Sequence, residues 1–248
     1  IIMIVAVGAL ATLYTAVGGV KAVIWTDTIQ AFALGGGLFV LLFYIVSQID
    51  GGWSVMIAEG IEADKFEMFS TSGGWGERNI YSACAYGFVI YLGAQVATYG
   101  GFQRYVTVDT ISDARRSLYV KGLFTLFACT LFFLVGTALF VFYHQSTEML
   151  ALFDAMSEGK AKDQLLPHFV VHHATGFGMT GLLLAGLFAA AMSSLDSGIN
   201  SMTASFVTDW RNGKEVGVTA NRIVTLVFGV VVTVAAVILV HVNPPVFD

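Results

Sequence analysis

The chain has 248 residues, of which 56% are hydrophobic and only 12% are charged, and its formal net charge is -5. Soluble domains usually carry roughly a quarter charged residues, and a chain of this length cannot hide so much apolar surface in a core of its own. This composition, with a mean hydropathy of +0.77, excludes an ordinary water-soluble domain. The sequence has no basic run of the kind that binds nucleic acid, so we expect no nucleic-acid partner.

Six segments approach the roughly 20 apolar residues that a membrane-spanning helix needs. In chain order they are residues 1–20, 24–49, 80–102, 118–143, 177–207 and 223–242. The sequence therefore predicts an all-α, polytopic transmembrane helical bundle in the lipid bilayer. Because the sequence opens inside an apolar run, at Ile1-Ile2-Met3, we expect it to be part of a longer chain.

Lys and Arg residues divide the connections between these segments into two groups. The turn after the first segment, the loop after the third and the loop after the fifth hold eight of the twelve Lys and Arg residues, counting Lys121 at the start of the fourth segment. The loops after the second and fourth segments hold the other four. Because positive charge accumulates on the cytoplasmic side, we expect the first group to face the cytoplasm and the second to face outside.

The loop before the fifth segment contains residues 163–169, which predict a short helix at the membrane surface. Four histidines lie in or beside this loop: His144, His168, His172 and His173. A metal site is one interpretation. Histidines at a membrane interface are more often simply solvated, and we favour that alternative.

Two carboxylates lie inside predicted spans, where ionisable side chains are costly and usually functional. They are Asp27 in the second segment and Asp196 in the fifth, at a similar depth. One face of the fifth segment is entirely polar, since positions spaced by three and four residues share a helix face. Its members are Ser193, Asp196, Ser197, Asn200 and Ser201. Hydroxyl and carboxylate oxygens at this density suit a hard cation such as sodium, and we favour this over ordinary interhelical hydrogen bonds.

The third segment mixes glycine, amide and aromatic residues and is poorly built as a continuous apolar helix. Helices interrupted in this way are a feature of transporters, in which the freed backbone groups line a cavity. Tyr91, Gln95 and Thr98 are therefore candidates to contact a substrate. Ordinary contacts between helices are an equal alternative.

Three stretches of the sequence match a known family. They are residues 14–30, Gln103-Arg104-Tyr105, and residues 190–201 followed by Val207-Thr208-Asp209-Trp210. On these residues the sequence resembles the sodium:solute symporter family, which includes sodium/glucose cotransporters, proline permease and bacterial sialic-acid transporters. The resemblance implies a LeuT-type five-plus-five inverted repeat in the plasma (inner) membrane. Residues 1–248 would form one partial transmembrane domain, corresponding to core helices four to nine.

The resemblance also implies which residues hold sodium. One site would use Asp27, Ser194 and Ser197, with Asp196 adjacent. A second would use Ser193, Ser194 and the carbonyl of Ala190, completed by backbone from a helix outside this sequence.

Two departures from the sugar cotransporters of that family bear on the substrate and the ion. Asp196 is acidic where those proteins commonly carry a hydroxyl residue, so it could bind the cation or hold a proton. Their aromatic inner gate corresponds to Ala94 or Tyr91 here, which argues against a sugar substrate.

These features predict a secondary active transporter that couples a sodium gradient to uptake of a small organic solute, and not an enzyme. Sodium is the coupling ion, and the solute, sodium and lipid are the expected partners. An intramembrane aspartyl protease is an alternative, because it also needs two membrane-embedded aspartates. Its Gly-x-Gly-Asp element is absent around Asp27 and Asp196. A channel or a purely structural bundle is a third possibility.

Overall fold

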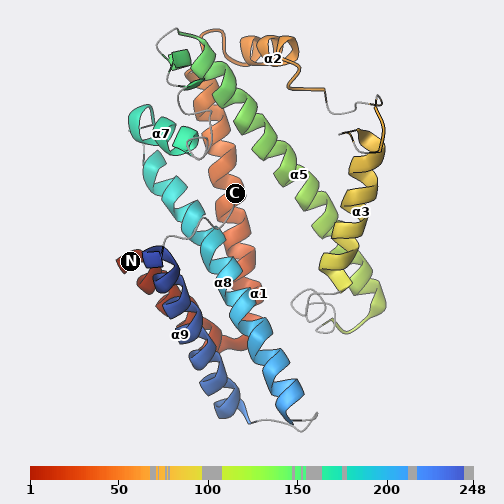
Figure 1. Ribbon diagram of the computed structural model, residues 1–248, viewed down its shortest axis with the longest axis vertical. Helices are drawn as coiled ribbons and strands as arrows, with labels where there is room; N and C mark the ends of the chain where they lie inside the picture. The colour runs from red at the N-terminus through yellow and green to blue at the C-terminus, as the bar shows by residue number, and fades with distance from the viewer. Residues whose placement is uncertain are drawn as a thin grey trace. The chain divides into compact units, whose positions relative to one another are not determined.

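The computed structural model describes residues 1–67, 71, 73–75, 77, 79–96, 108–146, 149–151, 153–154, 164–174, 178–211 and 217–242. These residues form helices and connecting turns, with no strand among them, which confirms the predicted all-α class. In chain order the helices are α1 (Ile2–Ser47), α2 (Gly52–Glu62), α3 (Ile80–Val96), α5 (Ile111–His144), α7 (Leu165–His172), α8 (Met179–Arg211) and α9 (Val218–Val242) (Figure 1).

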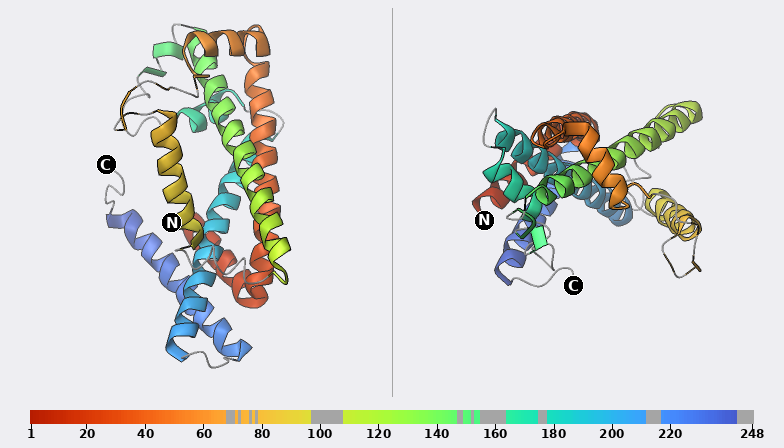
Figure 2. Two further views of the ribbon diagram at one scale, coloured as in Figure 1. Left: turned by 90° about the vertical axis from the view of Figure 1, so that its right-hand side faces the viewer. Right: turned by 90° about the horizontal axis from the view of Figure 1, so that it is seen from above.

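Helix α1 is broken at Gly19. Its 46 residues would extend roughly 70 Å as one straight rod, about twice the thickness of the hydrocarbon core of a bilayer. Gly19 has φ 58° and ψ -156°, a backbone conformation that residues with a side chain rarely adopt. The chain turns sharply there (Figure 2). The first two predicted spans therefore meet at a single glycine rather than at a loop.

Four described helices, α1, α5, α8 and α9, are long and apolar enough to cross a membrane. Because α1 holds two predicted spans, these four helices account for five of the six predicted segments. The remaining segment, 80–102, forms the shorter apolar helix α3 and is described as far as residue 96.

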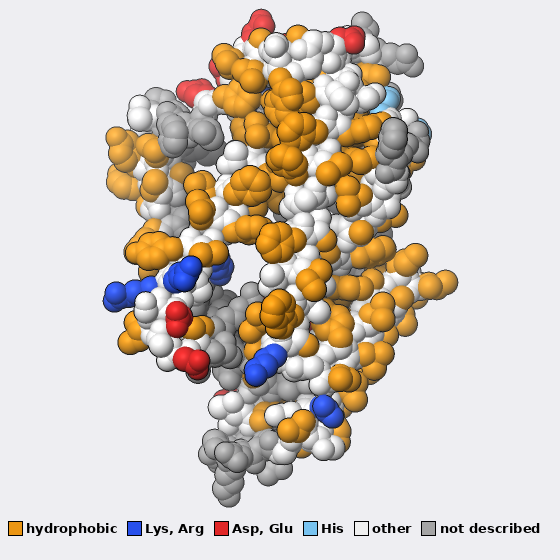
Figure 3. Space-filling view, turned by 180° about the vertical axis from the view of Figure 1, so that it is seen from behind, with side chains coloured by type: hydrophobic (Ala, Val, Ile, Leu, Met, Phe, Trp, Pro, Cys, Tyr) orange, Lys and Arg blue, Asp and Glu red, His pale blue; other side chains and the backbone are white. Residues whose placement is uncertain are grey.

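The surface of these helices is apolar. Large side chains such as Phe32 on α1 and Leu123 on α5 are exposed. Hydrophobic side chains cover much of the face seen in Figure 3, and few charged ones interrupt them. Such a surface is favourable in lipid and unfavourable in water, so the chain is an integral membrane protein.

The chain divides into two compact units. Unit 1 comprises residues 1–34, 93–109 and 185–248, and unit 2 comprises residues 35–92 and 110–184. Helices α1 and α8 each contribute to both.

Aromatic packing forms the core of unit 2. Phe142 of α5 and Phe169 of α7 are buried, and their rings meet edge to face at 4.9 Å between centroids. The Tyr44 hydroxyl of α1 donates a hydrogen bond to the carbonyl oxygen of His173, at 2.8 Å. The loops after α1 and α5 also meet, because the Asp50 amide donates to Oε1 of Gln145 at 3.2 Å. The two loops predicted to face outside therefore share one end of this unit. The short helix predicted in residues 163–169 corresponds to α7.

Close contacts between α1 and α9 define unit 1. Gly8 of α1 lies against Thr233 of α9, and Gly229 of α9 lies against Thr12 of α1. Small residues at such positions let membrane helices approach closely. The Arg222 guanidinium at the start of α9 donates to the carbonyl oxygen of Val17 at 3.3 Å. The turn at Gly19 and the loop before α9, both predicted to face the cytoplasm, thus lie at the same end of unit 1.

Many hydroxyl side chains inside these helices donate to the carbonyl oxygen four residues earlier on their own helix. Thr12 does so at 2.6 Å, Thr203 at 2.8 Å and Thr225 at 2.9 Å. A hydroxyl held in this way needs no partner from another helix or from water. A buried hydroxyl that makes no such bond is therefore unusual here.

Replacing Gly8 with alanine should destabilise the protein by about 1–3 kcal/mol, because over-packing forces neighbouring atoms to shift. The new Cβ would lie inside van der Waals distance of the Thr233 hydroxyl. That hydroxyl is held by a hydrogen bond to the Gly229 carbonyl oxygen at 2.8 Å, so it cannot turn away freely. The thermal midpoint of the purified full-length protein in detergent measures the effect.

Gly122 of α5 is the matched control, since a Cβ there would meet no atom within 4 Å. Gly122→Ala should leave the midpoint unchanged or raise it, and Thr233→Ala should restore part of the loss in Gly8→Ala. Equal midpoints for Gly8→Ala and Gly122→Ala would show that α1 and α9 do not pack as described.

Candidate functional site

Asp27 of α1 is held by two serines of α8, within unit 1. Ser193 Oγ donates a short hydrogen bond to Oδ1 of Asp27, and Ser197 Oγ lies 3.4 Å from Oδ2. The two serines are four residues apart, so they project from the same helix face on successive turns. The structure thus brings Asp27 to the polar face of α8, as the resemblance implied, but through Ser193 and Ser197 and not through Ser194.

Asp196 is fully buried, with 0% of its surface exposed. The Tyr14 hydroxyl donates to its Oδ2 at 2.6 Å, and Thr26 Oγ1 lies 3.4 Å from the same oxygen. Within the described part of the chain, Oδ1 of Asp196 has no hydrogen-bond partner. A buried polar atom without a partner is costly, and a bound ion is one way to offset that cost.

The two carboxylates belong to one cluster. Thr26, next to Asp27 on α1, lies 3.4 Å from Asp196, and Ser197, next to Asp196 on α8, lies 3.4 Å from Asp27. Gln30, one helical turn after Asp27, adjoins the Tyr14 hydroxyl, and its buried Oε1 also lacks a hydrogen-bond partner among the described residues. The cluster therefore offers carboxylate, amide and hydroxyl oxygens and no soft ligand, a set that suits a hard cation.

The Ser194 hydroxyl bonds to Ala190 of its own helix and not to Asp27. Ser194 is exposed, and its hydroxyl donates to the carbonyl oxygen of Ala190 at 3.1 Å. Of the six predicted cation ligands, the structure thus brings Asp27, Ser193 and Ser197 together and places Asp196 beside them. Ser194 and Ala190 form a separate pair on α8.

Sequence reasoning missed Tyr14, Thr26 and Gln30. A tyrosine in an apolar helix resembles a packing residue, and its hydroxyl becomes informative only when an acceptor is known. Gln30 could have been found, because it is a polar side chain inside a predicted span, one turn from Asp27.

The three predicted substrate contacts lie on or after α3. Tyr91 is 44% exposed. Gln95 belongs to α3 as well, although its side chain lies outside the described residues, and Thr98 is outside them altogether. Their role with substrate stays a prediction.

The histidines around α7 form an aromatic and hydrogen-bonded cluster in unit 2. The ring centroids of His168 and His172 are 4.4 Å apart, and Nδ1 of His168 is 2.9 Å from the Tyr143 hydroxyl. Within the described residues, no group of three or more His, Cys, Asp or Glu side chains could hold a metal ion. The metal interpretation of these histidines therefore gains no support.

Comparison with known proteins gives concordant matches. The family model for the sodium:solute symporter family matches residues 1–245. The sodium/sialic acid symporter SiaT of Proteus mirabilis (strain HI4320) is 33% identical over 213 residues, which cover 84% of this chain and 41% of that protein. Human sodium-coupled monocarboxylate transporter 1 is 28% identical over 217 residues, covering 83% of this chain and 33% of that one. The human sodium/iodide cotransporter is 29% identical over 212 residues, covering 82% and 31%.

A solved structure also matches the fold. It is a substrate-bound outward-open state of a Na+-coupled sialic acid symporter, described as revealing a novel Na+ site, with a TM-score of 0.79 and 28% identity. The match covers 97% of this chain and 51% of that one. It confirms that the chain forms part of a LeuT-type transmembrane bundle. The chain spans about half of this structure and less than half of the curated relatives that it matches.

Tyr14→Phe should lower the free energy of unfolding by about 1.5–3 kcal/mol, the usual contribution of a hydrogen bond to a charged group. The substitution removes the shortest hydrogen bond to Oδ2 of Asp196 among the described residues, and the Thr26 contact to this oxygen is longer. Unfolding of the full-length protein in mixed micelles measures the change. Tyr86→Phe on α3, where the ring is exposed, is the matched control and should stay within about 0.5 kcal/mol of wild type. Similar losses in both variants would mean that Tyr14 does not support Asp196.

Stability should fall as the pH is lowered from about 7 to about 5. Burial and then the like charge of His172 lower the pKa of His168 below its usual 6.5, and burial and then His168 lower the pKa of His173. The unfolded chain therefore binds more protons below pH 6.5, and stability decreases until the pH passes the folded-state pKa values. The thermal midpoint of the full-length protein, measured as a function of pH, tests this decrease in stability. A variant with His168→Gln and His173→Gln should show a flatter profile, and an unchanged slope would contradict this account.

Proposed function

The chain belongs to the sodium:solute symporter family, and we propose that it forms part of a secondary active transporter, in which a sodium gradient drives uptake of a small organic solute across the plasma membrane. One observation carries the proposal most directly. Asp27 and Asp196 are embedded in membrane helices and surrounded by hydroxyl and amide oxygens, at a place where a chain without ionic function would carry apolar residues.

Sodium binds, in this proposal, at Asp27, Ser193, Ser197 and Asp196. The negative charge of Asp27 compensates the charge of a desolvated cation. The hydroxyls of Ser193 and Ser197, which now donate to Asp27, can rotate so that their lone pairs face the ion while the carboxylate stays close. Oδ1 of Asp196 and Oε1 of Gln30 supply further oxygens, and both lack another partner within the described residues.

A second sodium site would use Ser194 and the carbonyl of Ala190, with Ser193 between the two sites. Ser194 lies away from Asp27 and against Ala190, which supports a separate role for this pair. Residues 1–248 would supply core helices four to nine, so backbone from outside this sequence would complete the second site.

Coupling follows from the position of the first site between two helices. Asp27 belongs to the second half of α1, whereas its partners belong to α8. An ion that binds both helices stabilises arrangements in which they are close. Any solute that favours the same arrangement is then bound more tightly when sodium is present, and sodium more tightly when the solute is present.

The solute is proposed to be a small organic anion. Sialic acid and monocarboxylates, the solutes in the names of two relatives, are organic anions, and iodide, in the name of a third, is an inorganic anion. Tyr91, Gln95 and Thr98 stay our candidates for contacts with it.

The comparisons favour transport over catalysis, because the relatives named above are transporters. An intramembrane aspartyl protease would need one of the two aspartates to act as an acid and a peptide to reach both. No observation favours that reaction here, and none favours a channel.

The proposal is tested with the full-length protein in liposomes. Uptake of labelled sialic acid and of pyruvate is measured under an inward sodium gradient and under an equal potassium gradient. The proposal is supported if the solute accumulates inside the liposomes above its external concentration and if this accumulation requires sodium. Sodium-independent equilibration of either solute indicates a channel and contradicts it.

Asp27→Ala should weaken sodium binding by roughly 10- to 100-fold, the equivalent of losing about 1.5–3 kcal/mol from a charged interaction. Solute affinity at saturating sodium should change much less, since the solute contacts are placed elsewhere. Solute affinity at low sodium should fall, because the two ligands are linked. Sodium titrations of solute binding in the full-length protein separate these effects.

Asp50→Ala is the matched control, since this exposed residue lies beyond the end of α1 and its hydrogen bonds with Gln145 use backbone atoms of Asp50. It should behave like wild type. If Asp27→Ala bound sodium normally and lost solute binding at every sodium concentration, Asp27 would be a solute ligand instead.

A further inference from the structure

Tyr14 reaches the two carboxylates from the other side of the break in α1. Its hydroxyl donates to Oδ2 of Asp196 at 2.6 Å, the shortest hydrogen bond to this carboxylate among the described residues. Thr26 and Asp27 belong to the second half of α1, whereas Tyr14 lies before Gly19 and belongs to the first half. Three segments therefore meet at the carboxylates: the two halves of α1 and the middle of α8.

Thr26 is a poor substitute for this hydrogen bond. Its hydroxyl lies 3.4 Å from Oδ2 of Asp196 and 3.0 Å from each of two carbonyl oxygens of its own helix, those of Ala22 and Val23. A hydroxyl has a single proton, so the carbonyl oxygens compete with the carboxylate for it. Tyr14 is thus the stronger of the two donors that α1 provides to Oδ2.

The bond from Tyr14 makes the two carboxylate oxygens of Asp196 different. Oδ2 is held by the phenol, whereas Oδ1 has no hydrogen-bond partner among the described residues. The side chain is fully buried, so bulk water does not compete for it. A carboxylate that is fixed through one oxygen keeps the other oxygen in one position, which is what a binding site for an ion requires. Oδ1 is the oxygen that Asp196 offers in the proposed sodium site.

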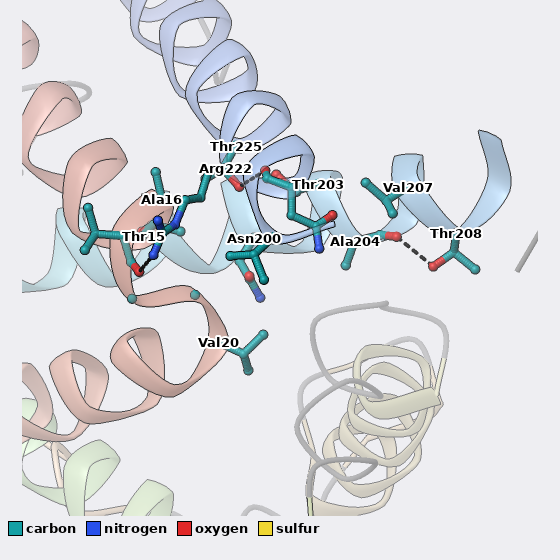
Figure 4. Close-up of a pocket in the computed structure, with 15 residues that line it drawn as sticks. Thr15, Ala16, Val20, Asn200, Thr203, Ala204, Val207, Thr208, Arg222 and Thr225 are labelled. Atoms are coloured by element: carbon teal, nitrogen blue, oxygen red, sulfur yellow. Dashed lines mark hydrogen bonds between the residues drawn. The ribbon is translucent and has the colours of Figure 1, made fainter. Parts of the chain in front are cut away.

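The first half of α1 is itself held in place by α9. The Arg222 guanidinium donates to the carbonyl oxygen of Val17 at 3.3 Å (Figure 4). On the other side of Tyr14 in the sequence, Thr12 packs against Gly229. Tyr14 therefore projects from a segment that is anchored before and after it, and such a support is needed for a side chain that positions another group.

We propose that Tyr14 is a positioning residue of the sodium site, which holds Asp196 for the ion and links the ion to the first half of α1. The inference rests on the sodium site proposed above and adds a residue to it. An ion at Asp27 and Asp196 then stabilises the angle at Gly19 as well as the approach of the second half of α1 to α8. Loss of the Tyr14 hydroxyl should lower the affinity for sodium.

The experiment uses the full-length protein in detergent. Its thermal midpoint is titrated with sodium chloride, with choline chloride as the replacement at constant ionic strength. Tyr14→Phe should raise the sodium concentration at half-maximal stabilisation roughly tenfold, as expected for loss of a hydrogen bond to a charged group. A purely structural role would lower the midpoint at every sodium concentration and leave that half-maximal concentration unchanged. Tyr86→Phe, at an exposed ring on α3, is the matched control and should behave like wild type.

A double-mutant cycle tests whether Tyr14 acts through Asp196. Asp196→Ala removes the acceptor, so in this background Tyr14→Phe should change the half-maximal sodium concentration less than about threefold. Hydrogen exchange of the wild-type protein is a second measurement that needs no variant. Sodium should slow amide exchange in residues 14–20, around the break, as well as in residues 24–30.

The inference is overturned if Tyr14→Phe keeps the sodium dependence of wild type, or if it has the same effect with and without the Asp196 carboxylate. If Tyr14→Phe does not fold, protection by sodium that is confined to residues 24–30 overturns it. Asp27→Ala separates this failure from failure of the proposed function. A wild-type sodium dependence in Asp27→Ala would show that the site itself is wrong, whereas the same result in Tyr14→Phe alone would leave Tyr14 a structural residue.

Discussion

The hydrogen bonds from Ser193 and Ser197 to Asp27 fix the rotation of α8 within unit 1. A carboxylate inside a membrane helix must find donors or a cation, because lipid offers neither. Two hydroxyls four residues apart can reach one carboxylate only if that face of α8 points at α1. With this rotation set, Asp196 turns toward Tyr14 and Ser194 turns away, toward solvent or lipid and its own backbone.

The break at Gly19 makes this arrangement possible from a single stretch of chain. Tyr14 lies five residues before the break, and Thr26 and Asp27 lie seven and eight residues after it. All three contact the same polar face of α8. A continuous helix would carry Tyr14 and Asp27 about 20 Å apart along its axis. The positive φ of Gly19 therefore brings two distant polar groups to one buried site.

Hydropathy and periodicity predicted the spans and the polar face of α8, because these depend on composition and helix geometry alone. The family resemblance, and not the helix pattern, implied that Asp27 joins this polar face. The sequence did not predict which neighbouring hydroxyl would face Asp27. Ser193 and Ser194 are chemically identical, and only the packing of α8 separates them. Tyr14 was missed because its ring suits an apolar helix and the role of its hydroxyl is recognised only beside Asp196.

The break at Gly19 was expected as a short turn a few residues later, since the pair Gly18-Gly19 alone does not specify φ. The side-chain contacts of the α3 candidates depend on neighbouring segments, which local sequence does not specify.

The hydroxyls that bond to carbonyl oxygens of their own helices allow the surface of these helices to become more or less polar. While Thr203 and Thr225 donate to carbonyl oxygens one turn back, their surface towards a neighbour is mainly a methyl group and a weak acceptor. A rotation about one side-chain torsion, between staggered wells, would turn the same residues into donors. A surface lined in this way can stay dry against lipid or another helix and become hydrated when the helices separate, without any change of backbone. Side-chain rotations are fast compared with the movement of whole helices, so the hydration of this surface can follow a helix movement without delay.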